Sequence, residues 1–173
     1  MKSCQCEIRP IREDDLPAFR ALRLEALRDH PEAFGSDYDE ATRDPDDKWQ
    51  DLMRRALAGE SDRVFLADAG NELAGMLGVH RSHGIKNRHS AMIWGVYIRP
   101  TYRGQGLTEK LMREAIAWAQ QQNVRILRLA VGTFNAPAIR CYQRCGFVVY
   151  GVSPEELRVG EKYHDEILMF RRV

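Results

Sequence analysis

The stretch that decides the fold reads Val96-Tyr-Ile-Arg-Pro-Thr-Tyr-Arg103-Gly-Gln-Gly-Leu-Thr108. It begins as an apolar strand, passes through a turn containing two glycines, and continues into a helix whose apolar residues recur every three or four positions. Gly104 and Gly106 permit backbone angles that other residues avoid, and they remove the Cβ atoms that would keep an anion from the first amides of the helix. The stretch therefore favours a phosphate site at the start of this helix.

A phosphate at this turn would receive several N–H hydrogen bonds and the positive end of the helix dipole, with Arg103 beside it as a charged clamp. The turn lacks the Gly-Lys-Ser/Thr of a Walker loop and the third glycine of the dinucleotide fingerprint. These two classes of phosphate loop are therefore excluded. A Gly-x-Gly by itself is equally compatible with an ordinary strand-to-helix turn.

The elements outward from this stretch are predicted from periodicity and from turn residues. Helices are predicted at 16–30, 48–58, 107–121 and 135–145, and strands at 6–12, 64–67, 73–79, 91–98, 126–131, 147–150 and 164–170, with 32–36 as a loop. Strands and helices in this order predict an α/β fold, a mixed sheet covered by helices, without internal repeats. The length of 173 residues and the 44% of hydrophobic residues fit one domain over residues 1–173.

The charge balance restricts the partners. The chain has 26 Lys and Arg against 25 Asp and Glu, a net charge of +1 that supplies no general attraction for nucleic acid or an anionic membrane. Residues 81–128 are the exception, with nine basic and two acidic side chains, and they suit a small anionic ligand or simply form a solvated basic face. No window is apolar enough to span a membrane, and the first residues do not resemble a signal peptide, so we expect a cytoplasmic protein.

The four cysteines are Cys4, Cys6, Cys141 and Cys145. Neither of their spacings is a common zinc pattern, and free thiols are expected in a reducing compartment. We therefore predict no metal site. Cys145 is expected to be buried and inert beneath Gly146, which argues against a cysteine nucleophile.

The stretch from Val96 to Thr108 resembles motif A of the GNAT family of N-acetyltransferases. The family pattern Arg/Gln-x-x-Gly-x-Gly/Ala appears here as Arg103-Gly-Gln-Gly106-Leu-Thr108. A second family motif, an Asn, an Ala and a Tyr-x-x-x-Gly-Phe, appears as Asn135-Ala-Pro-Ala-Ile-Arg-Cys-Tyr142-Gln-Arg-Cys-Gly-Phe147. The resemblance implies a mostly antiparallel sheet that is splayed at the motif A strand. It also implies direct attack of an amine on the thioester of acetyl-CoA, without an acyl-enzyme.

The resemblance assigns a role to each matching residue. Tyr142 would be the general acid that protonates the departing thiolate, Asn135 would hydrogen-bond the pantetheine arm, and the Val96 N–H would polarise the thioester carbonyl. The remaining cofactor-binding residues would be Tyr97 and Ile98 on the strand, and Arg103, Gly104, Gln105, Gly106, Leu107, Thr108 and Glu109 around the diphosphate. A CoA-binding sensor without turnover is the alternative.

Three departures or gaps limit what the resemblance carries. Thr108 replaces the usual second Gly or Ala, and the acidic Glu109 should weaken phosphate binding slightly. Met92 stands where some relatives have a general-base glutamate, and none of the five histidines is favoured as its replacement. The acceptor, a small-molecule or peptide amine, would enter between 34–39 and 153–164. The acidic residues of the first segment suit a cationic amine or a solvated loop, and pairing of two chains at the sheet edges stays open.

Overall fold

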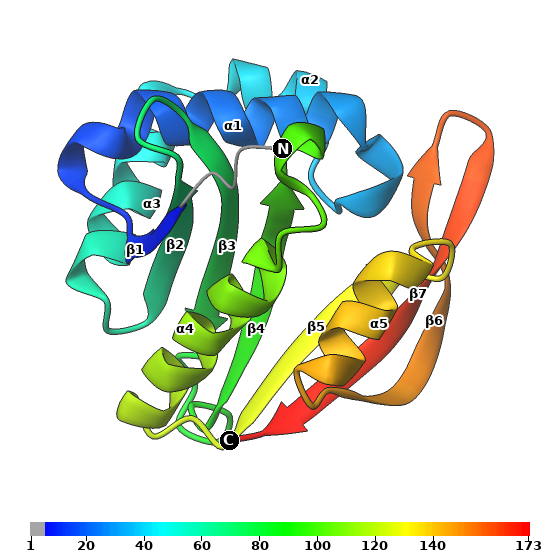
Figure 1. Ribbon diagram of the computed structural model, residues 1–173. Coiled ribbons are helices and arrows are strands. Elements are labelled where there is room, and N and C mark those ends of the chain that lie inside the picture. Colours follow the sequence, from blue (N-terminus) through cyan, green and yellow to red (C-terminus); the bar gives the residue numbers. More distant parts are fainter. Residues whose placement is uncertain (1–5) are drawn as a thin grey trace.

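The computed structural model describes residues 6–173, which form one seven-stranded sheet with helices on both faces (Figure 1). The strands are β1 (Glu7–Pro10), β2 (Asp62–Asp68), β3 (Leu73–Arg81), β4 (Ser90–Ile98), β5 (Ile126–Gly132), β6 (Val148–Val159) and β7 (Lys162–Arg172). The helices are α1 (Leu16–Asp29), α2 (Tyr38–Arg43), α3 (Asp46–Ala58), α4 (Leu107–Gln121) and α5 (Ala136–Arg144). The spatial order of the strands is β1-β2-β3-β4-β5-β7-β6, and β4 and β5 are parallel whereas the other neighbours are antiparallel. The α/β prediction with a mixed, mostly antiparallel sheet is confirmed.

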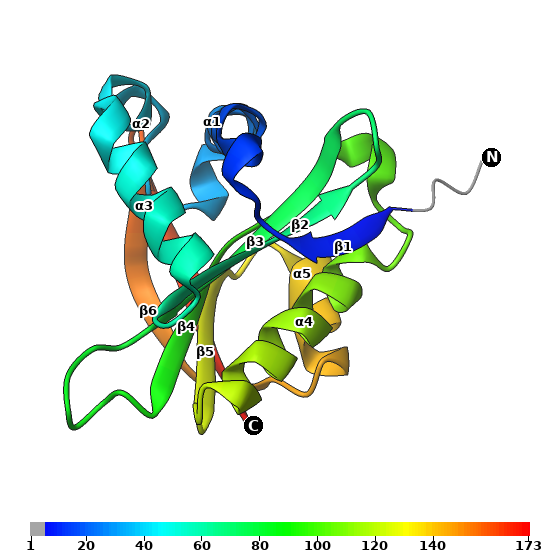
Figure 2. The ribbon, with the colours of Figure 1, turned by 90° about the vertical axis from the view of Figure 1, so that its left-hand side faces the viewer.

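Successive side chains of the central strands point to opposite faces of the sheet and form two hydrophobic cores, one on each face. On β2, Val64 and Leu66 face α1 and α3, whereas Phe65 and Ala67 face α4. Figure 2 shows α1 and α3 on one side of the sheet and α4 on the other. Because β2 and β3 are covered on both faces, their inner segments, 64–67 and 73–79, are continuous runs of apolar residues and glycine.

The ends of the helices follow local chemistry. The C-cap of α3 is Gly59, whose φ of +68° is the left-handed conformation that glycine adopts easily. Helix α1 ends at Asp29, two residues before Pro31, and its C-cap is His30. Both boundaries agree with the sequence-based prediction. None of the described helices has an apolar run long enough to cross a membrane.

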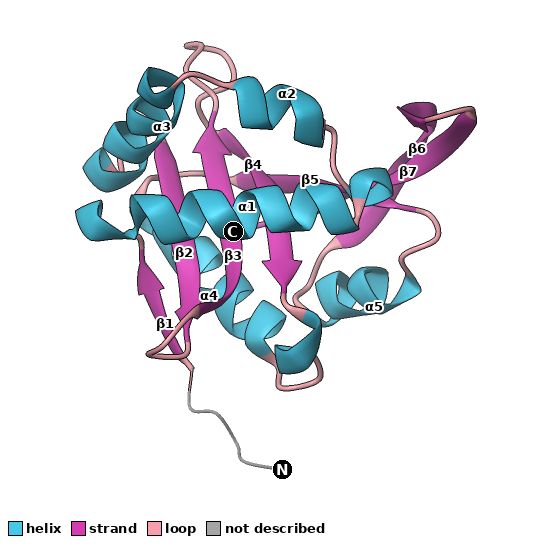
Figure 3. Cartoon of the chain, turned by 90° about the horizontal axis from the view of Figure 1, so that it is seen from above, coloured by secondary structure: helices cyan, strands magenta, loops and turns pink. Residues whose placement is uncertain are grey.

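The sheet opens between its two parallel strands. The β4–β5 ladder has three pairs, Ser90 with Ile126, Ala91 with Leu127 and Met92 with Arg128, and β4 then diverges from β5. The expected splay of the motif A strand is thereby confirmed. Figure 3 shows α5 near the end of β4, with the long β6–β7 hairpin above α5 in this view.

The structure corrects the predicted elements at three places. Helix α2 was not predicted, because six residues are too few to show a helical period. The hairpin strands β6 and β7 extend far beyond the predicted 147–150 and 164–170, because β6 is largely exposed and carries polar residues through two register irregularities. The predicted loop at 32–36 is partly a short 3-10 turn, Pro31–Ala33.

Candidate functional site

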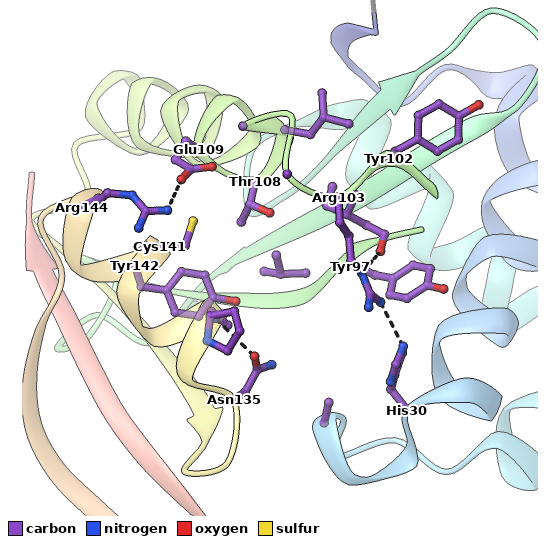
Figure 4. Close-up of a pocket in the computed structure, with 18 of the residues that line it drawn as sticks. His30, Tyr97, Tyr102, Arg103, Thr108, Glu109, Asn135, Cys141, Tyr142 and Arg144 are labelled. Atoms are coloured by element: carbon purple, nitrogen blue, oxygen red, sulfur yellow. Dashed lines mark hydrogen bonds and ion pairs between the residues drawn. The ribbon is translucent and has the colours of Figure 1, made fainter. Parts of the chain in front are cut away.

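A cleft of about 590 Å³ lies where β4 leaves β5 (Figure 4). Its walls come from the end of α1, the second half of β4, the turn before α4, and α5. Eleven of the twelve site residues predicted from the sequence, Tyr142 among them, line the cleft, and Gln105 is the exception. The second half of β4 and the two family motifs are thus brought together by the fold.

The glycine turn is open toward this cleft. Gly104 has φ +78° and Gly106 has φ +70°, and no atom lies within 4 Å of where a Cβ would stand on either residue. The N–H groups of both glycines and of Gln105 donate no recorded hydrogen bond to another described residue. Helix α4, fifteen residues long, starts directly after Gly106 and directs its free amides and its dipole to the same place. The turn can therefore bind a diphosphate through backbone groups.

The acid in the first turn of α4 is neutralised within the protein. Glu109 forms an ion pair with Arg144 of α5, which lowers the pKa of the Glu109 carboxyl. This pair links α4 to α5 at one end of the cleft, with Thr108 beside it (Figure 4). Arg144 was not predicted from the sequence, where its partner could not be identified. The pairing offsets much of the repulsion that Glu109 was expected to exert on phosphate groups.

The Arg103 side chain, which was expected to contact the phosphates, instead binds groups of the protein. Its Nε donates to the Ile98 carbonyl oxygen at 2.9 Å, and its Nη2 lies 3.0 Å from Nε2 of His30. Figure 4 shows the side chain pointing across the cleft toward His30. The guanidinium thus ties β4 to the end of α1. A role for this side chain at the phosphates stays a prediction, whereas the Arg103 backbone remains part of the turn.

A β-bulge shapes the strand that would bind pantetheine. The β3–β4 register shifts between Met76 and Gly78, so Gly95 and Val96 together oppose one residue of β3, and Gly95 has φ +63°. The sequence analysis did not identify this bulge, although a glycine inside an apolar strand is its usual signal. The bulge and the loss of pairing to β5 leave this part of β4 at the edge of the cleft. Ile98 follows at the cleft rim, 7% exposed.

Tyr97 contributes its backbone to the cleft, but its side chain belongs to the opposite core. The ring is 4% exposed, and the hydroxyl donates to Oε1 of Glu25 at 3.1 Å. Burial and this carboxylate raise the pKa of Tyr97 to about 12. The side chain is therefore part of the α1 packing.

Tyr142 and Asn135 both come from the second motif. The Tyr142 ring is 6% exposed and packs against Phe147, with a ring-centroid distance of 6.4 Å, and its hydroxyl points into the cleft (Figure 4). Burial raises the pKa of Tyr142, so the phenol is protonated at neutral pH. Asn135 is the N-cap of α5, and its side-chain oxygen accepts from the Ala138 N–H at 3.3 Å. No described residue accepts a hydrogen bond from its amide nitrogen.

Cys141 of α5 and Cys145, the C-cap of this helix, are free thiols in different environments. Cys141 is buried in the cleft wall, and its neighbour Cys145, burial and Glu109 all raise its pKa, so it is a weak nucleophile. Cys145 is only partly buried, so the expectation of a fully buried residue was wrong. Its position as the C-cap of a short helix, beyond the last helical residue, explains the difference. Cys6 is buried, and Cys4 lies outside the described residues.

Two of the histidines approach the cleft. His30 was expected to be a helix cap or a surface residue; it is the cap of α1, and it also lines the cleft. The His164 ring lies 5.7 Å from the ring of Phe134, which lines the cleft as well. Met92 is 44% exposed and pairs across the strands with His80. These positions do not assign any of the histidines as the general base.

One group of potential metal ligands occurs among the described residues. The ligand atoms of Asp62, His80 and His83 all lie within 4.8 Å of one another. The 3.0 Å contact between Nδ1 of His80 and Oδ1 of Asp62 is an ordinary hydrogen bond that needs no ion. This group lies away from the cleft, beside a second pocket on the α1 face.

The splayed mixed sheet, with a glycine turn that opens at the splay, provides a cleft that can hold an extended phosphate-bearing ligand. Residues 19–147 match the acetyltransferase (GNAT) family, and the chain belongs to this family.

The relatives agree with this assignment. An uncharacterized N-acetyltransferase of Methanocaldococcus jannaschii is 29% identical over 142 residues, which cover 81% of this chain and 59% of that protein. An acetyltransferase of the GNAT family from Streptococcus pneumoniae has a similar structure, with a TM-score of 0.86, 25% identity, and coverage of 98% and 99% of the two chains. A putative acetyltransferase of Salmonella typhimurium, solved with acetyl-CoA, has a TM-score of 0.83 at 22% identity, covering 96% of this chain and 93% of that one.

Proposed function

We propose that this chain transfers the acetyl group of acetyl-CoA to a primary amine within a complex of both substrates. The observation that carries the proposal is the pair of positive-φ glycines, Gly104 and Gly106, facing open space at the start of α4. Such a turn has free amides and a helix dipole to offer to a diphosphate. The acetyl-CoA held by the Salmonella neighbour of the same fold supports the choice of this cofactor.

The proposed binding mode uses the cleft from end to end. The diphosphate lies on the turn from Arg103 to Glu109, and the pantetheine arm runs along the unpaired edge of Val96, Tyr97 and Ile98. The amide nitrogen of Asn135 donates to this arm, while its oxygen caps α5. Leu107 is 3% exposed and anchors the turn in the core, so the amides are fixed before the ligand arrives.

The proposed reaction is a single acyl transfer. The amine nitrogen attacks the thioester carbonyl carbon, a C–N bond forms, and the C–S bond breaks. The Val96 N–H stabilises the carbonyl oxygen, and the Tyr142 hydroxyl gives its proton to the departing CoA thiolate. The nitrogen loses its extra proton to solvent, and the Tyr142 phenolate takes a proton back from solvent. The raised pKa of Tyr142 makes it a weaker acid than free phenol, but the same burial raises the proton affinity of the thiolate beside it.

The test incubates the protein with acetyl-CoA and a panel of primary amines, and a thiol reagent measures the CoA that is released. We expect acceptor-dependent release, with acetylated amine recovered in equal amount. Tight CoA binding without release for any acceptor would instead support the sensor alternative. Failure of acetyl-CoA to bind would refute both.

A further inference from the structure

A second pocket of about 480 Å³ lies on the α1 face of the sheet, between α1, α2, α3 and β4. It approaches the cleft at the β4 bulge. Trp94, which lines this pocket, directly precedes Gly95 and Val96, and the Trp94 ring covers Gly78 so closely that a Cβ there would lie 2.1 Å from it. An acceptor in this pocket would therefore approach the bulge from the face opposite α4.

Arg23 of α1 lines this pocket and reaches the bulge. A Cβ on Gly95 would stand 3.4 Å from its Nη1, so the guanidinium lies against the backbone of the bulge. Its central carbon is 5.0 Å from the ring centroid of Phe34 and 5.7 Å from that of Trp94. The charge is thus held between two aromatic rings, at the junction of the pocket and the cleft.

The charge of Arg23 is not neutralised within the described part of the chain. Nη2 donates to the Ser36 hydroxyl at 3.2 Å, but Nη1 is shielded from solvent and has no hydrogen-bond partner. Burial lowers the pKa of Arg23 to about 10. Arg23 is half-buried and has no acidic partner, which is unfavourable for its charge, and a ligand anion would offset this penalty.

The other cations of the pocket are already paired. Lys48 Nζ lies 2.7 Å from Asp44, and Arg55 contacts Asp62 at 3.6 Å. The Asp37 carboxylate accepts from the Glu40 N–H as the N-cap of α2. Glu40, one of the acidic residues that suggested a cationic acceptor from the sequence, also lines the pocket. Among the described residues that line the pocket, Arg23 is thus the basic residue without an acidic partner.

We infer that the acceptor is an α-amino acid whose carboxylate binds Arg23, an inference that rests on the proposed acetyl transfer. The amine and the carboxylate of an α-amino acid share one carbon, so a carboxylate at Arg23 places the amine beside Gly95 and Val96, where the thioester carbonyl is expected. A bidentate guanidinium–carboxylate pair also fixes the orientation of the amine. Trp49 and Leu52 line the pocket beyond and favour an apolar side chain.

The test compares acceptors that differ only in the carboxylate. Rates of CoA release are measured for L-phenylalanine, L-phenylalaninamide and phenethylamine, and for L-leucine and isoamylamine. We expect kcat/KM for each amino acid to exceed that of its carboxylate-free partner by about 100-fold, because the half-buried guanidinium stays without an anionic partner with the latter. Equal or faster acetylation of the carboxylate-free amines would overturn the inference and leave the acetyltransferase assignment intact.

Variants test Arg23 itself. Arg23→Gln is expected to abolish the preference for the carboxylate by raising KM for the amino acid, with the KM for acetyl-CoA unchanged. Arg20→Gln is the matched control, because Arg20 lies one turn earlier on α1 and pairs with the exposed Asp46. A preference that survives in folded Arg23→Gln would refute the role of Arg23. If Arg23→Gln does not fold, the wild-type comparison of paired acceptors still decides the acceptor class, and lack of acetyl-CoA binding by the wild type would refute the proposed function itself.

Discussion

The Tyr142 hydroxyl points into the cleft without a recorded hydrogen bond to another described residue, while its ring is packed against Phe147. Replacing Tyr142 with Phe removes the proton donor and keeps the packing. We expect kcat to fall by about 10²- to 10⁴-fold with little change in the KM for acetyl-CoA. Steady-state CoA release measures both constants.

Tyr150→Phe serves as the control for this substitution, because Tyr150 is 51% exposed on β6. It should leave kcat unchanged, and thermal melts should show that both variants fold. A Tyr142→Phe enzyme with the wild-type kcat would remove Tyr142 from the mechanism and leave protonation of the thiolate to water.

Gly104 tests the phosphate turn. Its φ of +78° makes alanine strained by about 1 to 2 kcal/mol, but the added methyl group meets no protein atom within 4 Å. The methyl group would enter the space assigned to the diphosphate. We expect Gly104→Ala to raise the Kd for CoA by tenfold or more, equivalent to about 1.4 kcal/mol, as measured by calorimetry.

Gly160 provides the matched control for strain. It has φ +60°, likewise has no atom within 4 Å of a Cβ position, and lies in the β6–β7 turn. Gly160→Ala should lose comparable stability and bind CoA normally. Equal CoA affinities for the two variants would contradict a diphosphate site at Gly104.

At the scale of elements, an ionic cluster fastens the start of α1 to the edge of the sheet. Arg9 of β1, 7% exposed, contacts Asp15 at 2.6 Å and Asp68 of β2 at 2.8 Å. The hydrogen bonds from Arg9 lower the pKa of Asp15 below its ordinary value. The stabilisation is therefore present above the unfolded-state pKa, about 3.9, and is lost as the pH falls through the lower folded-state pKa.

Asp15→Asn should therefore destabilise the protein in a pH-dependent way. We expect a loss of about 1 to 3 kcal/mol in the free energy of unfolding at pH 7, which shrinks below about pH 4 as the wild-type carboxylate is protonated. Urea titrations at several pH values measure it. The exposed neighbour Asp14 is the control, and a pH-independent difference for Asp15→Asn would contradict the ion-pair explanation.

The elements also show what the sequence could and could not predict. Strands covered on both faces, such as β2 and β3, have dense apolar runs, and α4 has a clear helical period, so their approximate positions followed from pattern alone. The exposed β6–β7 hairpin has no such pattern, because its residues face solvent and its pairing is irregular. The bulge at Gly95 depends on the register with β3, which a single strand does not contain.

In the site too, features local in the sequence could be predicted, whereas contacts between distant elements could not. The glycine turn and Tyr142 are local in sequence and were identified from motifs. The contact of Arg103 with His30 and the ion pair of Arg144 with Glu109 join elements that are distant in the chain, so they could not be predicted from a local motif. The unpaired charge of Arg23 could not be predicted from the sequence either, because it follows from the lack of an acidic partner in the described fold.

At the scale of the whole molecule, the cleft separates two parts of one sheet that share only three β4–β5 pairs. The Glu109–Arg144 ion pair is a further link, between α4 and α5. A ligand that contacts the glycine turn on one side and α5 on the other would connect both parts. Its binding energy would then stabilise the molecule as a whole, in addition to the residues it touches.

We therefore expect CoA at 100 times its Kd to add about 2.7 kcal/mol to the free energy of unfolding, and to raise the melting temperature by about 5 to 10 °C. Hydrogen exchange should slow both at the turn before α4 and along α5, because the ligand joins the two sides of the opening. Differential scanning fluorimetry and hydrogen-exchange mass spectrometry measure these effects. Protection confined to one side would mean that CoA does not bridge the cleft, and the binding mode proposed for Asn135 and Tyr142 would fail with it.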